Sequence, residues 1–215
     1  KAQKRLIKNS NLKNYELFVK KKYKFNAKGK YLNLLKWSIN NPKNFWKSIW
    51  DYSEVLGIKK DKFLINPSLS KSKFLLGSKL NYAENLLKNV KNKKAITFIS
   101  ENGFRQVKTW KNIYQNTSKI VNFLNSINLK KKDRVAAYLP NISETVEFFL
   151  ASSTIGTIWS SCSPDFGAQG VIERFSQINP KILIISDRYF YNGKQINVIK
   201  RLPEIISNIK SIKTV

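Results

Sequence analysis

The first 94 residues carry apolar side chains at the spacing of helices rather than of strands. In the segment 42–56, Pro42 suits the first helical position, Asn41 suits the N-cap and Gly57 suits the C-terminal stop. The positions that share one face of this predicted helix are Phe45, Trp46, Ile49, Trp50, Ser53 and Leu56. We therefore expect residues 1–94 to form a helical N-terminal extension.

From residue 95 onward, short apolar runs alternate with segments of helical spacing. Asn102-Gly103 is typical of a hairpin turn, Thr109 and Ser143 suit helix N-caps, and Gly156 suits a helix end. The predicted strands are 95–100, 104–108, 134–139, 157–160 and 182–185, and the predicted helices include 167–177 and a short one from Leu80. The pattern indicates an α/β fold.

Strands that are separated by helices of about ten residues pair in parallel through crossover connections. Ligands of such sheets bind beyond the carboxyl ends of the strands. We therefore expect residues 140–141, 161–166 and 186–188 to lie together on one functional edge.

The chain is strongly basic. Its 215 residues include 40 Lys and Arg against 13 Asp and Glu, a formal net charge of +27, and most of the excess lies in residues 1–94. Such a charge would attract nucleic acid, and a basic nucleic-acid-binding module is one alternative function. However, most lysines are scattered singly along the chain, so we interpret them as a solvated surface and expect neither a specific nucleic acid nor a membrane as partner.

The chain has no histidine and one cysteine, Cys162. Ser-His and Cys-His catalytic pairs, a structural zinc site and an internal disulfide are therefore excluded within it. No apolar run approaches the length of a membrane span, which favours a cytoplasmic protein. Since the chain lacks methionine and stops at Val215 in what resembles the start of a strand, we expect it to be a fragment.

Phosphate-binding motifs are missing from the chain. There is no Gly-x-Gly-x-x-Gly, and neither Gly29-Lys30 nor Gly193-Lys194 is followed by the Ser or Thr of a Walker loop. The residues alone therefore support an α/β domain with an open loop edge and go no further.

Several patches in a fixed order resemble a known family. They include residues 80–87, residues 138–141, the run Trp-Ser-Ser-Cys-Ser-Pro-Asp-Phe-Gly at 159–167 and the run Gln-Ile-Asn-Pro-Lys at 177–181. Together they are similar to the acyl-CoA synthetases of the adenylate-forming superfamily, and the run at 159–167 resembles the acetoacetyl-CoA synthetases among them. The resemblance implies that residues 95–215 are the first part of an AMP-binding domain, truncated before its ATP phosphate loop.

The resemblance also implies a reaction. Acetoacetate, ATP and coenzyme A, with Mg²⁺, would give acetoacetyl-CoA, AMP and pyrophosphate through an acyl-adenylate. An acetyl- or propionyl-CoA synthetase is the alternative within the family, and a non-catalytic protein that retains the fold is another. No catalytic residue and no metal ligand of the family matches this chain, so alone it should be inactive.

The resemblance does suggest residues for coenzyme A. Gly193 and Lys194 match a segment near its 3′-phosphate, although Tyr191 stands where relatives carry a second arginine. Ser163, Pro164 and Asp165 match a loop that borders the pantetheine arm. The alternatives are a surface lysine at 194 and, for Asp165, the N-cap of the following helix.

Overall fold

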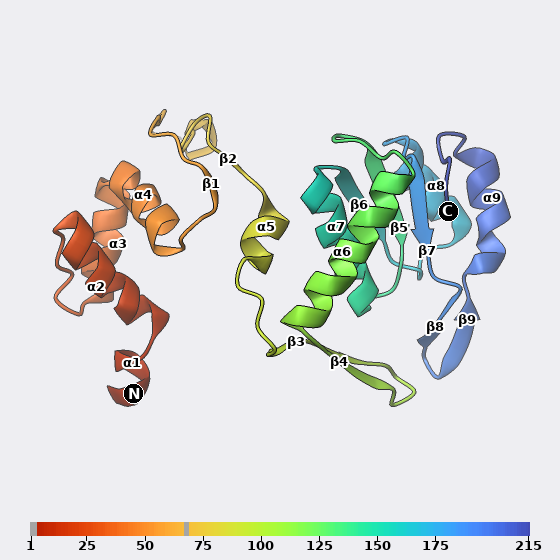
Figure 1. Cartoon of the computed structure of the whole chain (residues 1–215), viewed down its shortest axis with the longest axis horizontal. Coiled ribbons are helices and arrows are strands. Elements are labelled where there is room, and N and C mark those ends of the chain that lie inside the picture. Colours follow the sequence, from red (N-terminus) through yellow and green to blue (C-terminus); the bar gives the residue numbers. More distant parts are fainter. Residues whose placement is uncertain (1–3, 67–68) are drawn as a thin grey trace. The chain divides into compact units, whose positions relative to one another are not determined.

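The computed structural model describes residues 4–66 and 69–215. The chain consists of two compact units, Lys1–Leu80 and Asn81–Val215, called unit 1 and unit 2 below (Figure 1). The domain border after residue 94 that we expect from the sequence stays a prediction. Nowhere in the described parts of the chain is a helix long and apolar enough to cross a membrane.

Unit 1 is mainly helical. Its helices pack around a core of Tyr15, Val19, Ala27, Leu34 and Trp37, and the ring of Phe25 stacks on Trp37 with centroids 5.1 Å apart. The elements are α1 Lys4–Lys8, α2 Asn11–Tyr23, α3 Tyr31–Asn40, α4 Pro42–Tyr52, a 3-10 turn Leu69–Lys71, and the short antiparallel strands β1 Gly57–Ile58 and β2 Lys79–Leu80.

Helix α4 confirms only part of the prediction for 42–56. It begins at Pro42, but the Asn41 side chain makes no capping hydrogen bond, and the helix ends at Tyr52 rather than near Gly57. Gly57 instead lies in β1 with φ +153°, where a Cβ would lie 2.4 Å from the carbonyl oxygen of Lys79. Glycine is needed there because β2 approaches closely. Of the predicted face, Trp46 and Leu56 remain exposed.

The carboxylate of Asp51 in unit 1 interacts with three hydrogen-bond donors. Its carboxylate forms ion pairs with Lys22 at 2.7 Å and with Lys59, and it accepts a 3.0 Å hydrogen bond from Tyr23. Burial alone would raise the pKa of Asp51, but these partners outweigh it and lower that pKa from 3.8 to about 2. The cluster ties α2 and α4 to the segment after β1.

The Asp51 cluster should make unit 1 sensitive to acid. A carboxylate whose pKa is depressed on folding stabilises the protein above its unfolded pKa and loses that contribution as the pH falls toward its folded pKa. We expect about 2 kcal/mol of the free energy of unfolding of unit 1 to disappear between about pH 4 and pH 2. Asp51→Asn should remove this contribution at pH 7, measured by urea unfolding with hydrogen exchange of unit 1 peptides.

A matched control is available for this prediction. Asp61 forms an ion pair with Lys47, but its side chain is 63% exposed, so Asp61→Asn should change stability by less than about 1 kcal/mol. Equal effects of the two substitutions would contradict the role given to Asp51.

Unit 2 contains the predicted parallel sheet, in the order β6-β5-β7 (Figure 1). Strands β5 Arg134–Tyr138, β6 Ile158–Cys162 and β7 Ile182–Ile185 pair in parallel, and Thr214 adds a parallel bridge to Ile182. The α/β fold class predicted from the sequence is therefore confirmed. The remaining elements are α5 Tyr82–Leu87, α6 Trp110–Ser126, α7 Ser143–Ile155, α8 Ala168–Ser176, a 3-10 turn Ile199–Arg201, α9 Leu202–Asn208, and the hairpins β3 Lys94–Ile99 with β4 Arg105–Thr109 and β8 Arg188–Tyr191 with β9 Lys194–Asn197.

The alternation of side chains along β5 divides the core of unit 2 into two layers. Val135 packs with Leu124 of α6 and Ala151 of α7. Ala136 and Tyr138 point the other way, into a cluster that also contains Val171 and Phe175 of α8, Ile205 of α9 and Ile209 just after α9. All of β5 from Val135 to Tyr138 is fully buried, as its uninterrupted apolar character predicts.

The local signals of unit 2 are mostly confirmed. Thr109 caps α6 in a capping box with Asn112, and Gly156 ends α7 with φ +77°. Ser143 is not the N-cap of α7, however, because Ile142 holds that position and the Ser143 hydroxyl bonds to Gln106 and Glu144. Other differences are shifts of a few residues: α5 begins at Tyr82 after the N-cap Asn81, β6 runs on to Cys162, and Gly167 is the N-cap of α8. The hairpin β8–β9 and the helix α9 were not predicted.

Candidate functional site

The carboxyl ends of the three parallel strands meet at one edge, as predicted. Tyr138, the last residue of β5, lies in register with Cys162 of β6 and with Ile185 of β7. The segments that follow the strands, 140–141, 163–166 and 186–188, therefore start side by side. Ser161 and Cys162, which we expected in the loop, are the last residues of β6.

A groove of about 560 Å³ opens at this edge. Its walls come from the β3–β4 hairpin, from residues 140–142 after β5, and from residues 186–190 after β7. Aromatic side chains line much of it, namely Phe98, Phe104, Tyr189 and Phe190. The loop 163–166 does not contribute to its lining, so the groove and the loop are separate features of the edge.

The hairpin β8–β9 carries the first group of expected coenzyme A residues. Asn192 and Gly193 form its turn with positive φ angles of 50° and 70°, a geometry that favours Asn-Gly. The Gly193 amide donates a 3.3 Å hydrogen bond to the carboxylate of Glu101. Lys194 opens β9 opposite Tyr191, and both side chains are exposed. A basic group is thus presented to solvent, while the neighbouring backbone amide of Gly193 faces a carboxylate.

The loop after β6 carries the second group. The Ser163 hydroxyl donates to Asp165 at 2.7 Å, and the hydroxyl of Tyr189 donates to the other carboxylate oxygen of Asp165 at 2.9 Å. These bonds lower the pKa of Asp165. Burial, and secondly the Asp165 carboxylate, raises the pKa of Tyr189 to about 12. Since Tyr189 lies in β8, one bond between side chains links the loop to the hairpin.

The alternative role of Asp165 as a helix cap is wrong. The N-cap of α8 is Gly167, and no side chain caps that helix. The Asp165 side chain is instead directed to Ser163 and Tyr189. A sequence pattern cannot distinguish these outcomes, because the competing partner Tyr189 is 24 residues away.

Arg201 also contacts the loop 163–166, a role that the sequence patterns did not predict. Its Nη1 atom donates to the carbonyl oxygens of Pro164 at 2.8 Å and Phe166 at 3.0 Å, and also to the hydroxyl of Tyr138. Tyr138 is fully buried, and burial raises its pKa although Arg201 opposes the shift. The sequence did contain one indication of such a contact: Tyr138 ends an apolar strand, and a buried tyrosine hydroxyl needs a hydrogen-bond partner.

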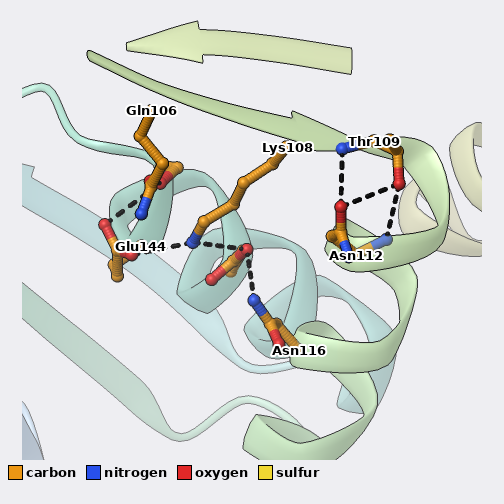
Figure 2. Close-up of polar contacts among 8 residues, drawn as sticks. Gln106, Lys108, Thr109, Asn112, Asn116 and Glu144 are labelled. Atoms are coloured by element: carbon orange, nitrogen blue, oxygen red, sulfur yellow. Dashed lines mark hydrogen bonds and ion pairs between the residues drawn. The ribbon is translucent and has the colours of Figure 1, made fainter. Parts of the chain in front are cut away.

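A second polar cluster joins β4, α6 and α7 (Figure 2). Lys108 forms ion pairs with Glu144 at 2.7 Å and Glu147 at 2.9 Å, and Asn116 donates to Glu147 at 2.9 Å. Glu147 is almost fully buried. Both glutamates lie near the N-terminus of α7, as expected for the helix dipole, but the sequence does not reveal that a lysine 36 to 39 residues earlier pairs with them.

We looked among the described residues for a nucleophile and for metal ligands. Cys162 is buried, and burial raises the pKa of its thiol, which disfavours the thiolate that a nucleophile requires. The described residues contain no group of three or more Cys, Asp or Glu side chains that could hold a metal ion. Neither the thiol of Cys162 nor a metal-binding group among the described residues therefore provides a reacting group at this edge.

Comparison with known proteins identifies the class to which this fold and edge belong. The family model of AMP-binding enzymes matches residues 84–215. Because this match covers more than half of the chain, the chain belongs to the AMP-binding enzyme family.

Individual similar proteins narrow the comparison to one group within the family. The chain is 36% identical over 174 residues to an acetoacetyl-coenzyme A synthetase of Rhizobium meliloti, covering 80% of this chain and 27% of the relative. It is 35% identical over 190 residues to an acetoacetyl-CoA synthetase of Xenopus tropicalis, covering 86% and 28%. Among solved structures, an acetoacetyl-CoA synthetase from Streptomyces lividans matches with a TM-score of 0.88 and 25% identity, over 98% of this chain and 33% of that one.

The similarity extends over only part of each relative. The chain spans less than a third of the length of these curated relatives. What the relatives do as whole proteins therefore enters only as a proposal for the protein to which this chain belongs.

Proposed function

We propose that this chain is part of an acetoacetate–CoA ligase. The reaction would join acetoacetate to ATP as an acyl-adenylate with release of pyrophosphate, and the thiol of coenzyme A would then displace AMP. The observation that carries the proposal is the segment 159–167, whose family-like sequence folds as the end of a parallel strand, a loop and the start of a helix. The acetoacetyl-CoA synthetases among the similar proteins support the same substrate.

The alternatives from the sequence have less support. Family membership accounts for residues 84–215, whereas a nucleic-acid-binding module is favoured by the net charge alone. An acetyl- or propionyl-CoA synthetase remains the competing substrate assignment. We further propose a cytoplasmic location, which the single unpaired thiol of Cys162 supports.

The substrate assignment can be tested on the full-length protein. With ATP, Mg²⁺ and coenzyme A present, acetoacetate should support faster AMP formation than acetate, propionate or longer acids. A preference for acetate or propionate would contradict the assignment and leave the family intact. The 215-residue chain alone should form no acyl-adenylate, because no catalytic residue of the family matches it.

This chain would contribute the coenzyme A side of the site. The exposed ammonium of Lys194 suits the 3′-phosphate. The amide of Gly193 donates to Glu101 in this structure, so it would have to exchange that carboxylate for the phosphate. The loop with Ser163, Pro164 and Asp165 would border the pantetheine arm. When bound, coenzyme A supplies the thiol that accepts the acyl group, and these residues would only bind and orient it.

Lys194→Ala tests the phosphate contact in the full-length enzyme. Because a charge-assisted hydrogen bond contributes about 1.5 kcal/mol, KM for coenzyme A should rise roughly tenfold. Dephospho-coenzyme A lacks the 3′-phosphate, so its KM should not change. Lys200→Ala, at an exposed lysine of the following turn, is the control. An equal rise for both thiols would place Lys194 away from the phosphate.

A further inference from the structure

The guanidinium of Arg201 is the centre of the contacts that shape the loop 163–166. We infer that Arg201 is a positioning residue for the transfer to coenzyme A, acting through the loop rather than on the ligand. The inference rests on the proposed function, because it takes this loop as the border of the pantetheine arm. Arg201 is not among the residues that the family resemblance suggested for coenzyme A.

One nitrogen atom of Arg201 makes all three contacts. Nη1 donates to the carbonyl oxygens of Pro164 and Phe166, two residues apart in the loop, and to the hydroxyl of Tyr138. The two carbonyls must face the same point, so the loop backbone curves around the cation. Hydrogen bonds from a charged donor are about twice as strong as neutral ones, which makes this curvature costly to change.

Tyr138 attaches this arrangement to the core of unit 2. Its ring is fully buried in the cluster between the sheet and helices α8 and α9. Its hydroxyl accepts from Arg201 and shares its one proton between the carbonyl oxygens of Phe166 and, at 3.2 Å, Pro164. The loop is thereby held by a fixed ring and a cation together, so that loss of the cation leaves the buried hydroxyl with one partner fewer.

The 3-10 turn that carries Arg201 directly follows the hairpin β8–β9. The hairpin closes at its base, where the amide of Val198 donates to the carbonyl oxygen of Asp187 at 2.8 Å, and Arg201 follows three residues later. Tyr189 of the hairpin reaches Asp165 of the loop. The loop and the hairpin are therefore held at a set spacing, and coenzyme A is proposed to touch both.

The contacts predict a distinctive effect of Arg201→Met in the full-length enzyme. A misplaced binding loop weakens productive binding, so KM for coenzyme A should rise roughly tenfold. KM for dephospho-coenzyme A should rise by the same factor, because both thiols share the pantetheine arm. Acetoacetate-dependent exchange of pyrophosphate into ATP, which precedes the thiol step, should be unchanged.

Two further variants separate positioning from folding. Arg201→Lys should restore much of the affinity, since a single ammonium offers three donors where one nitrogen now makes three contacts. Tyr138→Phe keeps the ring and removes the hydroxyl, and it should raise KM for both thiols in the same proportion. Lys200→Met, which removes a neighbouring exposed charge, should behave as wild type.

The outcomes are distinguishable. An unchanged KM for coenzyme A in Arg201→Met would overturn the inference. So would a parallel loss of pyrophosphate exchange and thiol transfer that lysine does not rescue, because that pattern marks a purely structural residue. Failure of the proposed function shows separately, as a wild-type enzyme that forms no acetoacetate-dependent AMP.

Discussion

Lys108→Met should lower the free energy of unfolding of unit 2 by roughly 3–5 kcal/mol, the usual cost of leaving a buried charge without its partner. The side chain of Lys108 is only 11% exposed and that of Glu147 only 3%, so the remaining carboxylate could not be solvated in place. Glu144 is less critical, because its side chain is 45% exposed. Urea unfolding followed by hydrogen exchange of unit 2 peptides measures the change.

The same cluster predicts a response to alkali. Burial by itself would lower the pKa of Lys108, but its hydrogen bonds and charges with Glu144 and Glu147 raise it above 10.5. A lysine with a raised folded pKa stabilises the protein below its unfolded pKa and loses this effect as the pH rises through the folded value. The wild type should therefore lose stability above about pH 10.5, and Lys108→Met should lose less.

Two controls make the Lys108 prediction specific. Lys108→Met/Glu147→Gln removes the buried charge but keeps an acceptor for Asn116, so it should recover much of the loss. Lys111→Met makes the same change at an exposed position on α6 and should lie within about 0.5 kcal/mol of wild type. A loss at Lys108 no larger than at Lys111 would contradict the role of the ion pairs.

Phe175→Ala should cost roughly 3–5 kcal/mol, because it removes a buried aromatic ring and leaves a cavity. Phe175 is 1% exposed and lies in the cluster with Leu183 of β7 and Ile205 of α9. The control is Phe123→Ala on α6, where the ring is 44% exposed and the loss should stay below about 1 kcal/mol. Similar losses at both positions would show that the layer between α8, α9 and the sheet is not the main core.

Local signals explain which parts of the fold could be predicted. The strand predicted at 134–139, the capping residue Thr109 and the terminating Gly156 each depend on signals within a few residues. The structure has the strand at Arg134–Tyr138 and confirms both the cap and the helix end. Parallel pairing followed from the spacing of strands and helices. The prediction at Ser143 was wrong, because Ile142 is the N-cap of α7 and the Ser143 hydroxyl bonds to Gln106. Asn41 is the N-cap of α4 as predicted, but its side-chain amide donates to the carbonyl of Trp37 and makes no capping bond.

The candidate site was predictable only in its location. The edge of the sheet followed from topology, and the residues 163–165 and 193–194 followed from the resemblance. The links between them could not be predicted, because Tyr189–Asp165 and Arg201–Pro164 join residues 24 and 37 positions apart. Lys108 and Glu147 are 39 positions apart, so periodicity gives no information on their pairing.

Tyr138 has one end among hydrocarbon side chains and the other among the carbonyls of a surface loop. A substitution that repacks its neighbours in α8 or α9 would tilt the ring and displace the loop with it. If the loop borders coenzyme A as proposed, substitutions that change the volume of this interior will alter the affinity for the thiol without changing any residue near the ligand. Interior positions around this ring are accordingly promising targets when relatives with different coenzyme preferences are compared or engineered.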